Sequence, residues 1–229
     1  MVNVKGKWAL VTGSSRGVGR QIALFMAKEG CNLILHSRSL AHTGKLLAEV
    51  TAMGVEAYAV EAELSDPAAV NRMLDEMEEK GTPVDIVFND AGVQIAYRDN
   101  YWETLVEDFT QSFMINTIAP AIICYRLIPK MIERGFGRVI NTTSGIRNEP
   151  QQAGYSASKA ALDKFTTDLA SALSEADVMM NPDGSGLAAH GWVGECTGSC
   201  GSCVPGIVVG AFLDDGKSGR LLPAQALRV

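Results

Sequence analysis

A glycine-rich run near the start of the chain, Thr-Gly-Ser-Ser-Arg-Gly-Val-Gly at residues 12–19, separates a short apolar stretch from a helical one. The apolar stretch, residues 7–12, is expected to be a buried strand, and residues 17–29 the first helix. Glycine permits a tight turn and a close approach of the backbone to a phosphate, and the start of a helix attracts anions. The run therefore predicts a strand–loop–helix unit that holds a phosphate group.

The rest of the chain repeats this alternation of strands and helices. Strands are expected at residues 31–36, 55–60, 84–88, 137–142, 177–180 and 220–222, and helices at 40–53, 68–80, 102–134 and 155–175. Such alternation indicates right-handed βαβ units. We expect an α/β fold, a doubly wound parallel sheet with helices on both faces (Rossmann-like), in a single domain over residues 1–229.

The composition excludes several classes of function. A net charge of −6 gives no electrostatic footprint for nucleic acid. No signal peptide and no uninterrupted apolar run of membrane-spanning length is visible. Five cysteines, an odd number, indicate a reducing compartment rather than a disulfide framework. We expect a cytoplasmic protein with no nucleic-acid or membrane partner.

The end of the second strand bears on the choice of dinucleotide. Where a carboxylate would bind a ribose 2′-hydroxyl, the chain has Ser37 and Arg38, and Arg16 lies within the glycine loop. Two guanidiniums and a hydroxyl suit a 2′-phosphate, which favours NADP over NAD. The alternative is that both arginines are solvated surface charges. The three histidines are expected at incidental surface or loop positions.

A tyrosine and a lysine four residues apart, Tyr155 and Lys159, share one face of a helix, and Ser144 lies upstream. A nearby ammonium favours the phenolate and is expected to lower the pKa of Tyr155 from about 10 towards neutrality. The phenol would then be usable for proton transfer at physiological pH.

With these residues the chain resembles the short-chain dehydrogenase/reductase family, of the single-domain type. The family's Thr-Gly-x3-Gly-x-Gly loop matches residues 12–19, its Asn-x-Ala-Gly motif residues 89–92, and its catalytic residues match Asn116, Ser144, Tyr155 and Lys159. The resemblance implies these cofactor-binding residues: Gly13, Ser15, Arg16, Gly17, Val18, Gly19, Ser37, Arg38, Glu63, Leu64, Asn89, Ala91, Gly92, Tyr155 and Lys159. Two departures are an interval of only eleven residues between Ser144 and Tyr155, and Glu63 where many members carry Asp.

The resemblance also implies a reaction: NADP(H)-dependent interconversion of a small-molecule carbonyl and a secondary alcohol by hydride transfer. Tyr155 would be the acid/base, Ser144 would orient the substrate oxygen, and Lys159 would hold the nicotinamide ribose. Asn116 would position a water, and Asn89 would steady the sheet. An NADP(H)-binding sensor or scaffold without turnover is the alternative.

The family commonly forms dimers or tetramers through its two long helices, and a homotetramer or homodimer is expected here. The apolar residues of the first helix that support this are Ile118, Ala121, Ile122, Tyr125, Leu127 and Ile128. The small residues of the second are Ala157, Ala160, Ala161 and Ala170. The alternative is that both sets only cover the sheet within one subunit.

A Gly/Ser/Cys-rich segment, residues 182–204, stands where the substrate loop is expected. Three interpretations remain open. Cys196, Cys200 and Cys203 could ligate a metal with His190, although paired Cys-x2-Cys knuckles are absent and we expect no metal. The segment could be a flexible loop. The favoured hypothesis is a local frameshift, because residues 184–203, back-translated with permitted codons and read one base later, can give the family's Pro-Gly-x3-Thr pattern, and the sequence on both sides resembles the family.

Overall fold

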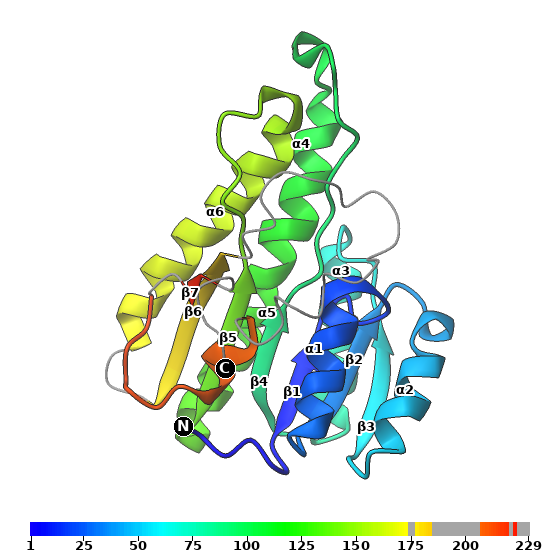
Figure 1. Cartoon of the computed structure of the whole chain (residues 1–229), viewed down its shortest axis with the longest axis vertical. Coiled ribbons are helices and arrows are strands. Elements are labelled where there is room, and N and C mark those ends of the chain that lie inside the picture. The colour runs from blue at the N-terminus through cyan, green and yellow to red at the C-terminus, as the bar shows by residue number, and fades with distance from the viewer. Residues whose placement is uncertain (174–176, 185–206, 220–221, 224–229) are drawn as a thin grey trace.

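The computed structural model describes residues 1–173, 177–184, 207–219 and 222–223. Within them, seven strands form one sheet in which every neighbouring pair is parallel (Figure 1). The strands are β1 (Trp8–Val11), β2 (Asn32–Ser37), β3 (Ala57–Glu61), β4 (Val84–Asn89), β5 (Gly137–Thr142), β6 (Val178–Gly184) and β7 (Leu222–Pro223). Their order, β3-β2-β1-β4-β5-β6-β7, confirms the predicted doubly wound α/β fold.

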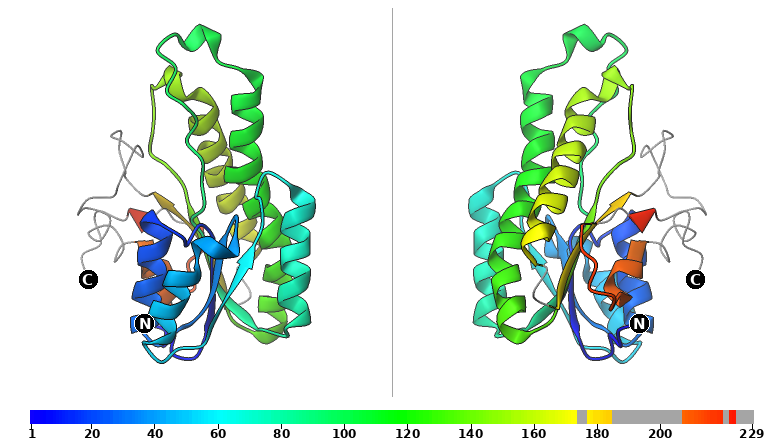
Figure 2. Two further views of the ribbon diagram at one scale, coloured as in Figure 1. Left: turned by 90° about the vertical axis from the view of Figure 1, so that its right-hand side faces the viewer. Right: turned by 90° about the vertical axis from the view of Figure 1, so that its left-hand side faces the viewer.

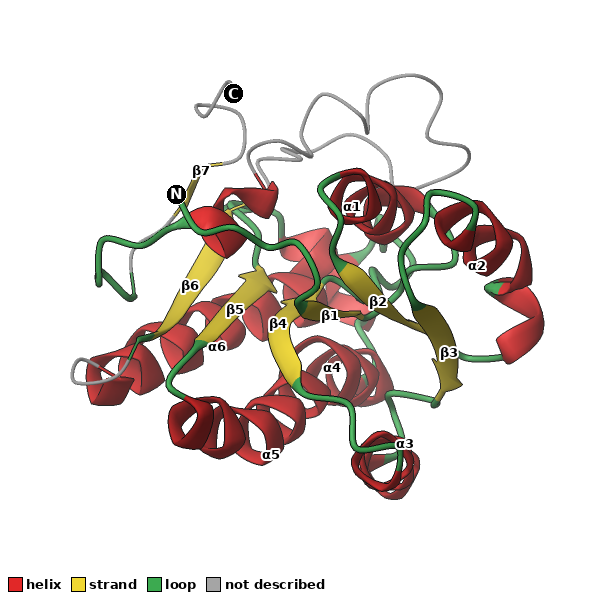
Figure 3. Ribbon diagram, turned by 90° about the horizontal axis from the view of Figure 1, so that it is seen from below, coloured by secondary structure: helices red, strands yellow, loops and turns green. Residues whose placement is uncertain are grey.

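Helices cover both faces of the sheet (Figure 3). On one face lie α1 (Gly17–Lys28), α2 (Gly44–Thr51) and a helical stretch over residues 207–212. On the other lie α3 (Pro67–Glu79), α4 (Val106–Phe113), α5 (Ala119–Arg134) and α6 (Ala153–Ala170). Each face has its own apolar core, because alternate strand residues point to opposite sides. Ala9 and Val11 belong to the core under α1, whereas Leu10 belongs to the core above α5.

Two expected helices are interrupted. The stretch expected at 40–53 consists of a 3-10 turn, η1 (Leu40–His42), followed by α2. The one expected at 102–134 contains a 3-10 turn, η2 (Tyr101–Glu103), then α4, a π-turn, η3 (Met114–Ile118), and α5. Pro120 lacks the N–H that an α-helix would pair with the carbonyl of Asn116. The bonding widens instead, and the Ala119 N–H reaches the carbonyl of Met114.

The sixth strand is longer than expected. It continues past residue 180 to Gly184, so the first two residues of the unusual segment 182–204 pair with β5, Pro182 opposite Asn141 and Asp183 opposite Thr142, while Gly184 pairs with β7. The apolar pattern ends before the pairing does, because a polar residue still bonds through its backbone. Residues 185–204, with all three cysteines of the proposed metal site, lie outside the described residues.

Among the described residues, one helical span, Val106–Arg134, is long and apolar enough to cross a membrane by length and composition. The sequence had shown no uninterrupted apolar run of that length. Half of the span's most apolar window is buried inside the protein. That burial fits a core helix packed on β4, β5 and α3.

Candidate active site

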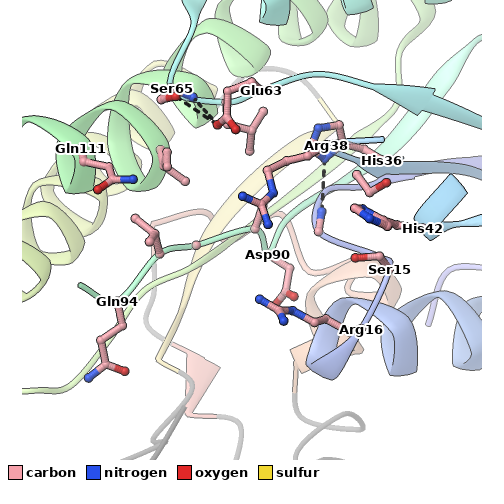
Figure 4. A pocket seen from close by; sticks show the side chains of 17 residues that line it. Ser15, Arg16, His36, Arg38, His42, Glu63, Ser65, Asp90, Gln94 and Gln111 are labelled. Carbon is pink, nitrogen blue, oxygen red and sulfur yellow. Dashed lines mark hydrogen bonds between the residues drawn. The ribbon is translucent and has the colours of Figure 1, made fainter. Parts of the chain in front are cut away.

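A cavity of about 710 Å³ opens at the carboxyl ends of β1 to β4 (Figure 4). Its lining comes from the loops that follow these four strands and from one side of α4 and η3. The lining residues are Gly13, Ser15, Arg16, His36, Ser37, Arg38, His42, Glu63, Leu64, Ser65, Asp90, Ala91, Gly92, Val93, Gln94, Gln111 and Ile115. The strand order reverses between β1 and β4, and doubly wound sheets bind ligands at that point. Nine of the predicted cofactor residues meet here.

Glycines form the floor of this cavity for steric reasons. Gly13 has a φ of +69°, and a Cβ on it would lie 2.9 Å from the Cα of Ala91. A Cβ on Gly19 would lie 2.6 Å from the carbonyl oxygen of Gly13. Gly17 has a φ of +59° and begins α1. Gly17, Val18 and Gly19 therefore form the first helical turn behind the cavity, rather than its lining.

His36 anchors the glycine loop, which corrects the expectation of an incidental surface or loop position. Its ring is 2% exposed. Its Nδ1 accepts a hydrogen bond from the Gly13 N–H at 3.2 Å, and its Nε2 lies 3.1 Å from the carbonyl oxygen of Ala62. Only the neutral ring protonated at Nε2 satisfies both contacts. Burial lowers the pKa of His36 to about 4, so the ring stays neutral at physiological pH.

Two guanidiniums line the cavity, beside the glycine loop and the end of β2. Arg16 lies at the start of α1 and Arg38 just after β2. In the described part of the chain neither has an ion-pair partner. By contrast, Ser37 donates its hydroxyl hydrogen to the carbonyl oxygen of Ser39 at 2.6 Å. The arginines are therefore the available donors for a phosphate.

The remaining predicted cofactor residues divide into two groups. Glu63 and Leu64 line the cavity, but the Glu63 carboxylate accepts bonds from the backbone N–H and the hydroxyl of Ser65. Asn89 lies below the cavity, where its amide donates to the Asn141 side chain on β5 at 2.8 Å. Asn89 therefore ties β4 to β5, the steadying role that the family resemblance implies.

Tyr155, the predicted acid/base, lies on α6, and Ser144 lies just after β5. Tyr155 is 8% exposed, and its hydroxyl shares a hydrogen bond with the side chain of Ser144. The short interval between these residues therefore does not separate them. The backbone N–H of Ile146 also donates to the Ser144 hydroxyl, at 3.3 Å. Ser144 and Tyr155 thus present two hydroxyl groups together, an arrangement that can hold and protonate one oxygen atom.

The expected lowering of the Tyr155 pKa is not found. Burial raises its pKa, the charge of Asp90 raises it further, and the bond to Ser144 lowers it. Lys159 is absent from these causes: its ammonium donates to the carbonyl oxygen of Thr142 at 2.6 Å. The four-residue spacing puts Tyr155 and Lys159 on one helix face, but the lysine side chain extends towards β5 instead of the phenol.

Asn116 lies in the π-turn, and its side chain forms hydrogen bonds with the loop that follows β4. Its side-chain oxygen accepts from the Val93 N–H at 2.8 Å, and its amide donates to the Val93 carbonyl and to Ser158. A Cβ on Gly92 would lie 3.3 Å from the Asn116 oxygen and 3.4 Å from the Lys159 nitrogen. Asn116 and Lys159 therefore meet at Gly92, the last residue of the Asn-x-Ala-Gly motif.

One charged residue of the cavity was not predicted. Asp90, inside that same motif, is 5% exposed and accepts from the Thr142 hydroxyl at 3.1 Å. Burial raises its pKa to about 6, against the attraction of Lys159 and the bonds from Thr142 and the Gly19 N–H. Its position between two matched residues was the available signal, since a carboxylate there lies at the end of a buried strand.

Known proteins share this fold and part of this sequence. A family model described as short chain dehydrogenase matches residues 7–186. A short-chain type dehydrogenase/reductase of Picea abies is 33% identical over 77% of this chain and 68% of the relative. A solved 3-oxoacyl (acyl-carrier-protein) reductase from Agrobacterium tumefaciens C58 with NADP bound is 30% identical, with a TM-score of 0.75, covering 81% of this chain and 71% of that one. An NAD⁺-bound xylitol dehydrogenase is 25% identical, with a TM-score of 0.84, covering 97% and 98%.

The chain therefore belongs to the short-chain dehydrogenase/reductase family. It is an oxidoreductase of the class that acts on CH–OH or carbonyl groups with a nicotinamide dinucleotide. The predicted family and enzyme class are confirmed.

Proposed function

We propose that this protein is an NADP(H)-dependent oxidoreductase that interconverts a small-molecule carbonyl and a secondary alcohol, with Tyr155 as acid/base. The observation that carries the proposal is the hydrogen-bonded pair of Tyr155 and Ser144 on the helix that also carries Lys159. This set favours turnover over the alternative of a sensor or scaffold. When bound, the nicotinamide would supply or accept the hydride.

The choice of NADP is supported by charge. Arg16 and Arg38 line the cavity, and no carboxylate follows β2, where one would bind a ribose 2′-hydroxyl. Glu63, the nearest acidic residue after β3, is engaged with Ser65. The NADP-bound and NAD⁺-bound relatives share the fold. The fold thus accepts either dinucleotide, and the arginines would decide between them.

The residues beside β5 would act on the substrate oxygen. Ser144 would donate a hydrogen bond that orients the carbonyl, and Tyr155 would give its phenolic proton to that oxygen as it gains negative charge. The raised pKa keeps Tyr155 protonated at neutral pH, the form that a carbonyl reduction requires. Lys159 would bind the nicotinamide ribose, and Asn116, which holds Val93 in place, would order the loop beside it.

We propose a single dinucleotide-binding and catalytic domain over residues 1–229, in a cytoplasmic homotetramer or homodimer. The two cysteines in the described residues, Cys31 and Cys124, are both buried free thiols, which fits a reducing compartment. Exposed apolar side chains along α5 support the assembly.

A substrate panel tests the activity. The full chain is incubated with ketones, aldehydes and secondary alcohols and with NADPH, NADH or their oxidised forms, and nicotinamide absorbance is followed. We expect turnover with NADPH or NADP⁺. Tyr155→Phe should lower kcat by about 10²- to 10⁴-fold, because it removes only the proton-transfer hydroxyl, and should leave the NADPH Kd nearly unchanged. Tyr97→Phe, which alters a 56% exposed tyrosine, is the control. A near-native rate for Tyr155→Phe would show that another group transfers the proton.

A further inference from the structure

Asp90 places a carboxylate where a dinucleotide diphosphate would bind. It follows β4, lines the cavity, and is 5% exposed. Figure 4 shows its side chain beside the glycine loop, on the same side of the cavity as Ser15 and Arg16. Its backbone neighbours Asn89 and Ala91 belong to the family motif, but the carboxylate brings a charge that the motif does not require.

The carboxylate shares a backbone donor with that diphosphate. The N–H of Gly19, in the first turn of α1, donates to Asp90. A Cβ on Gly19 would lie 3.0 Å from the Asp90 Oδ2, so the two groups are in close contact. The N–H groups of a first helical turn are those that bind a phosphate. A bound diphosphate and an ionised Asp90 would therefore be two anions at one helix end.

We propose that Asp90 takes up a proton from solvent when the dinucleotide binds, so that cofactor affinity falls as pH rises through neutrality. The inference rests on the proposed cofactor site. A carboxylic acid keeps the carbonyl oxygen that accepts from Gly19 or Thr142 and loses the charge that repels a phosphate.

The free protein is already close to this change. The pKa of Asp90, about 6, already lies near neutrality, so a modest further rise protonates the carboxylate at pH 7. A like charge brought nearby raises a carboxyl pKa further. The protonated form would therefore dominate in the complex. Because the bound state holds more protons than the free protein, cofactor affinity is highest at low pH and is lost as pH rises above 6.

Other charged and titratable groups lie around Asp90. Lys159 on α6 and Arg16 on the glycine loop supply positive charge, and the Glu63 side chain, across the cavity, accepts a hydrogen bond from Ser65. Tyr155 remains a neutral phenol because its pKa is raised. The ring of His36 on β2 stays neutral because its pKa is about 4.

Proton uptake by Asp90 would also change the pKa of Tyr155. The charge of Asp90 is one of the causes that raise the Tyr155 pKa. Neutralising Asp90 removes that cause. Dinucleotide binding would therefore lower the Tyr155 pKa, which is the direction expected from the family resemblance.

Isothermal titration calorimetry measures directly the number of protons taken up when the dinucleotide binds. The whole wild-type chain is titrated with NADP⁺ at pH 7 in two buffers of different ionisation enthalpy, and with NAD⁺, which lacks a titrating 2′-phosphate. We expect wild-type protein to take up at least about 0.3 proton more per dinucleotide than Asp90→Asn. Between pH 6 and 8 its affinity should fall at least about fivefold more than that of the variant. Asp163→Asn, which removes a charge on α6 away from the cavity lining, should behave as wild type.

The outcomes separate this inference from the proposed function. Binding of either dinucleotide with equal proton uptake by wild type and Asp90→Asn would overturn the role of Asp90 and leave the cofactor site intact. Absence of binding would overturn the proposed function itself. If Asp90→Asn does not fold, the wild-type titration with NAD⁺ still decides, because binding without proton uptake contradicts the inference.

Discussion

Two ionisable side chains buried at the glycine loop, His36 and Asp90, have pKa values shifted in opposite directions. For His36 the folded value, about 4, lies below the usual 6.5, so its stabilising effect is complete above pH 6.5 and is lost as pH falls to 4. For Asp90 the folded value, about 6, lies above the usual 3.8, so folding is favoured as pH falls from 6 to 3.8. The two contributions oppose each other in mild acid.

We expect the choice of dinucleotide to depend on Arg38. Arg38→Asp replaces the cation beside the 2′-phosphate with an anion that repels it and can accept from a ribose 2′-hydroxyl. We expect NADP⁺ affinity to fall about 10- to 100-fold and NAD⁺ affinity to hold or rise. Fluorescence titration with both dinucleotides measures the ratio.

The control for this change is Arg72→Asp, which reverses an exposed charge on α3. It should leave the ratio of the two affinities as in wild type. If Arg38→Asp also leaves the ratio as it was, the arginine is a solvated surface charge and the case for NADP loses its main support.

Residues fixed by local spacing could be predicted from the sequence. Gly13, Gly19 and Tyr155 belong to short patterns whose geometry is set within one loop or helix. His36 and Asp90 could not be assigned, because their burial and partners come from β3 and β5, far along the chain. The pKa of Tyr155 was mispredicted for the same reason: Lys159 contacts Thr142, which lies on another element.

At the scale of elements, the glycine loop is held on three sides. The N–H of Ser14 donates to the His36 carbonyl on β2, and Thr12 links the loop to the end of β4 through the Ala91 N–H. The start of α1 packs against Gly13 without space for a methyl group. The loop is therefore preformed, which lowers the entropic cost of binding a dinucleotide.

Gly19→Ala tests this close packing. The added Cβ would lie 2.6 Å from the backbone carbonyl of Gly13, which can move only if the loop moves. We expect a stability loss of about 1–3 kcal/mol and at least tenfold weaker dinucleotide binding. Urea unfolding and fluorescence titration measure the two effects.

A matched substitution exists in α2. Gly44 begins that helix, and a Cβ there would meet nothing within 4 Å. Gly44→Ala should therefore be neutral or stabilise by up to about 1 kcal/mol, with dinucleotide binding unchanged. Equal behaviour of the two variants would mean that the loop yields easily and is not preformed.

Element boundaries followed the sequence where apolar runs end at turn residues. β5 was predicted residue for residue, because glycine precedes it and polar residues follow it. The break between α4 and α5 was not predicted, because Met114, Ile115 and Ile118 continue the apolar helical pattern. The break arises from backbone bonding around Pro120, which a side-chain pattern does not reveal.

At the scale of the whole molecule, α4 and α6 project beyond the strands (Figure 2). From the end of η3 along α5, the exposed apolar residues Ile118, Tyr125 and Ile132 follow each other at seven-residue intervals, on one side of the helix. Tyr125, which is 65% exposed, packs edge-on against Phe165 of α6. Of the residues expected to support assembly, Leu127 and Ile128 are buried against the sheet and cannot contribute.

Assembly through this face is the whole-molecule prediction. We expect sedimentation at micromolar concentration to show a tetramer or dimer. Tyr125→Asp should shift the protein towards monomer, because it buries a charge in an apolar contact. Leu40→Asp, at a 48% exposed position beside α2, should leave the oligomer intact. A wild-type monomer would show that α5 only covers its own sheet.

The π-turn also sets the rotational phase of one long helix. Gln111, before the turn, faces the cavity, while Tyr125, after it, faces outward. Each residue of an α-helix advances about 100°, and a π-turn accommodates one residue more than an α-turn. The extra residue is therefore taken up within the π-turn, and α4 and α5 keep the relative orientation of a regular helix that is one residue shorter. The cavity side of α4 and the outward side of α5 stay in phase although the connection between them is one residue longer.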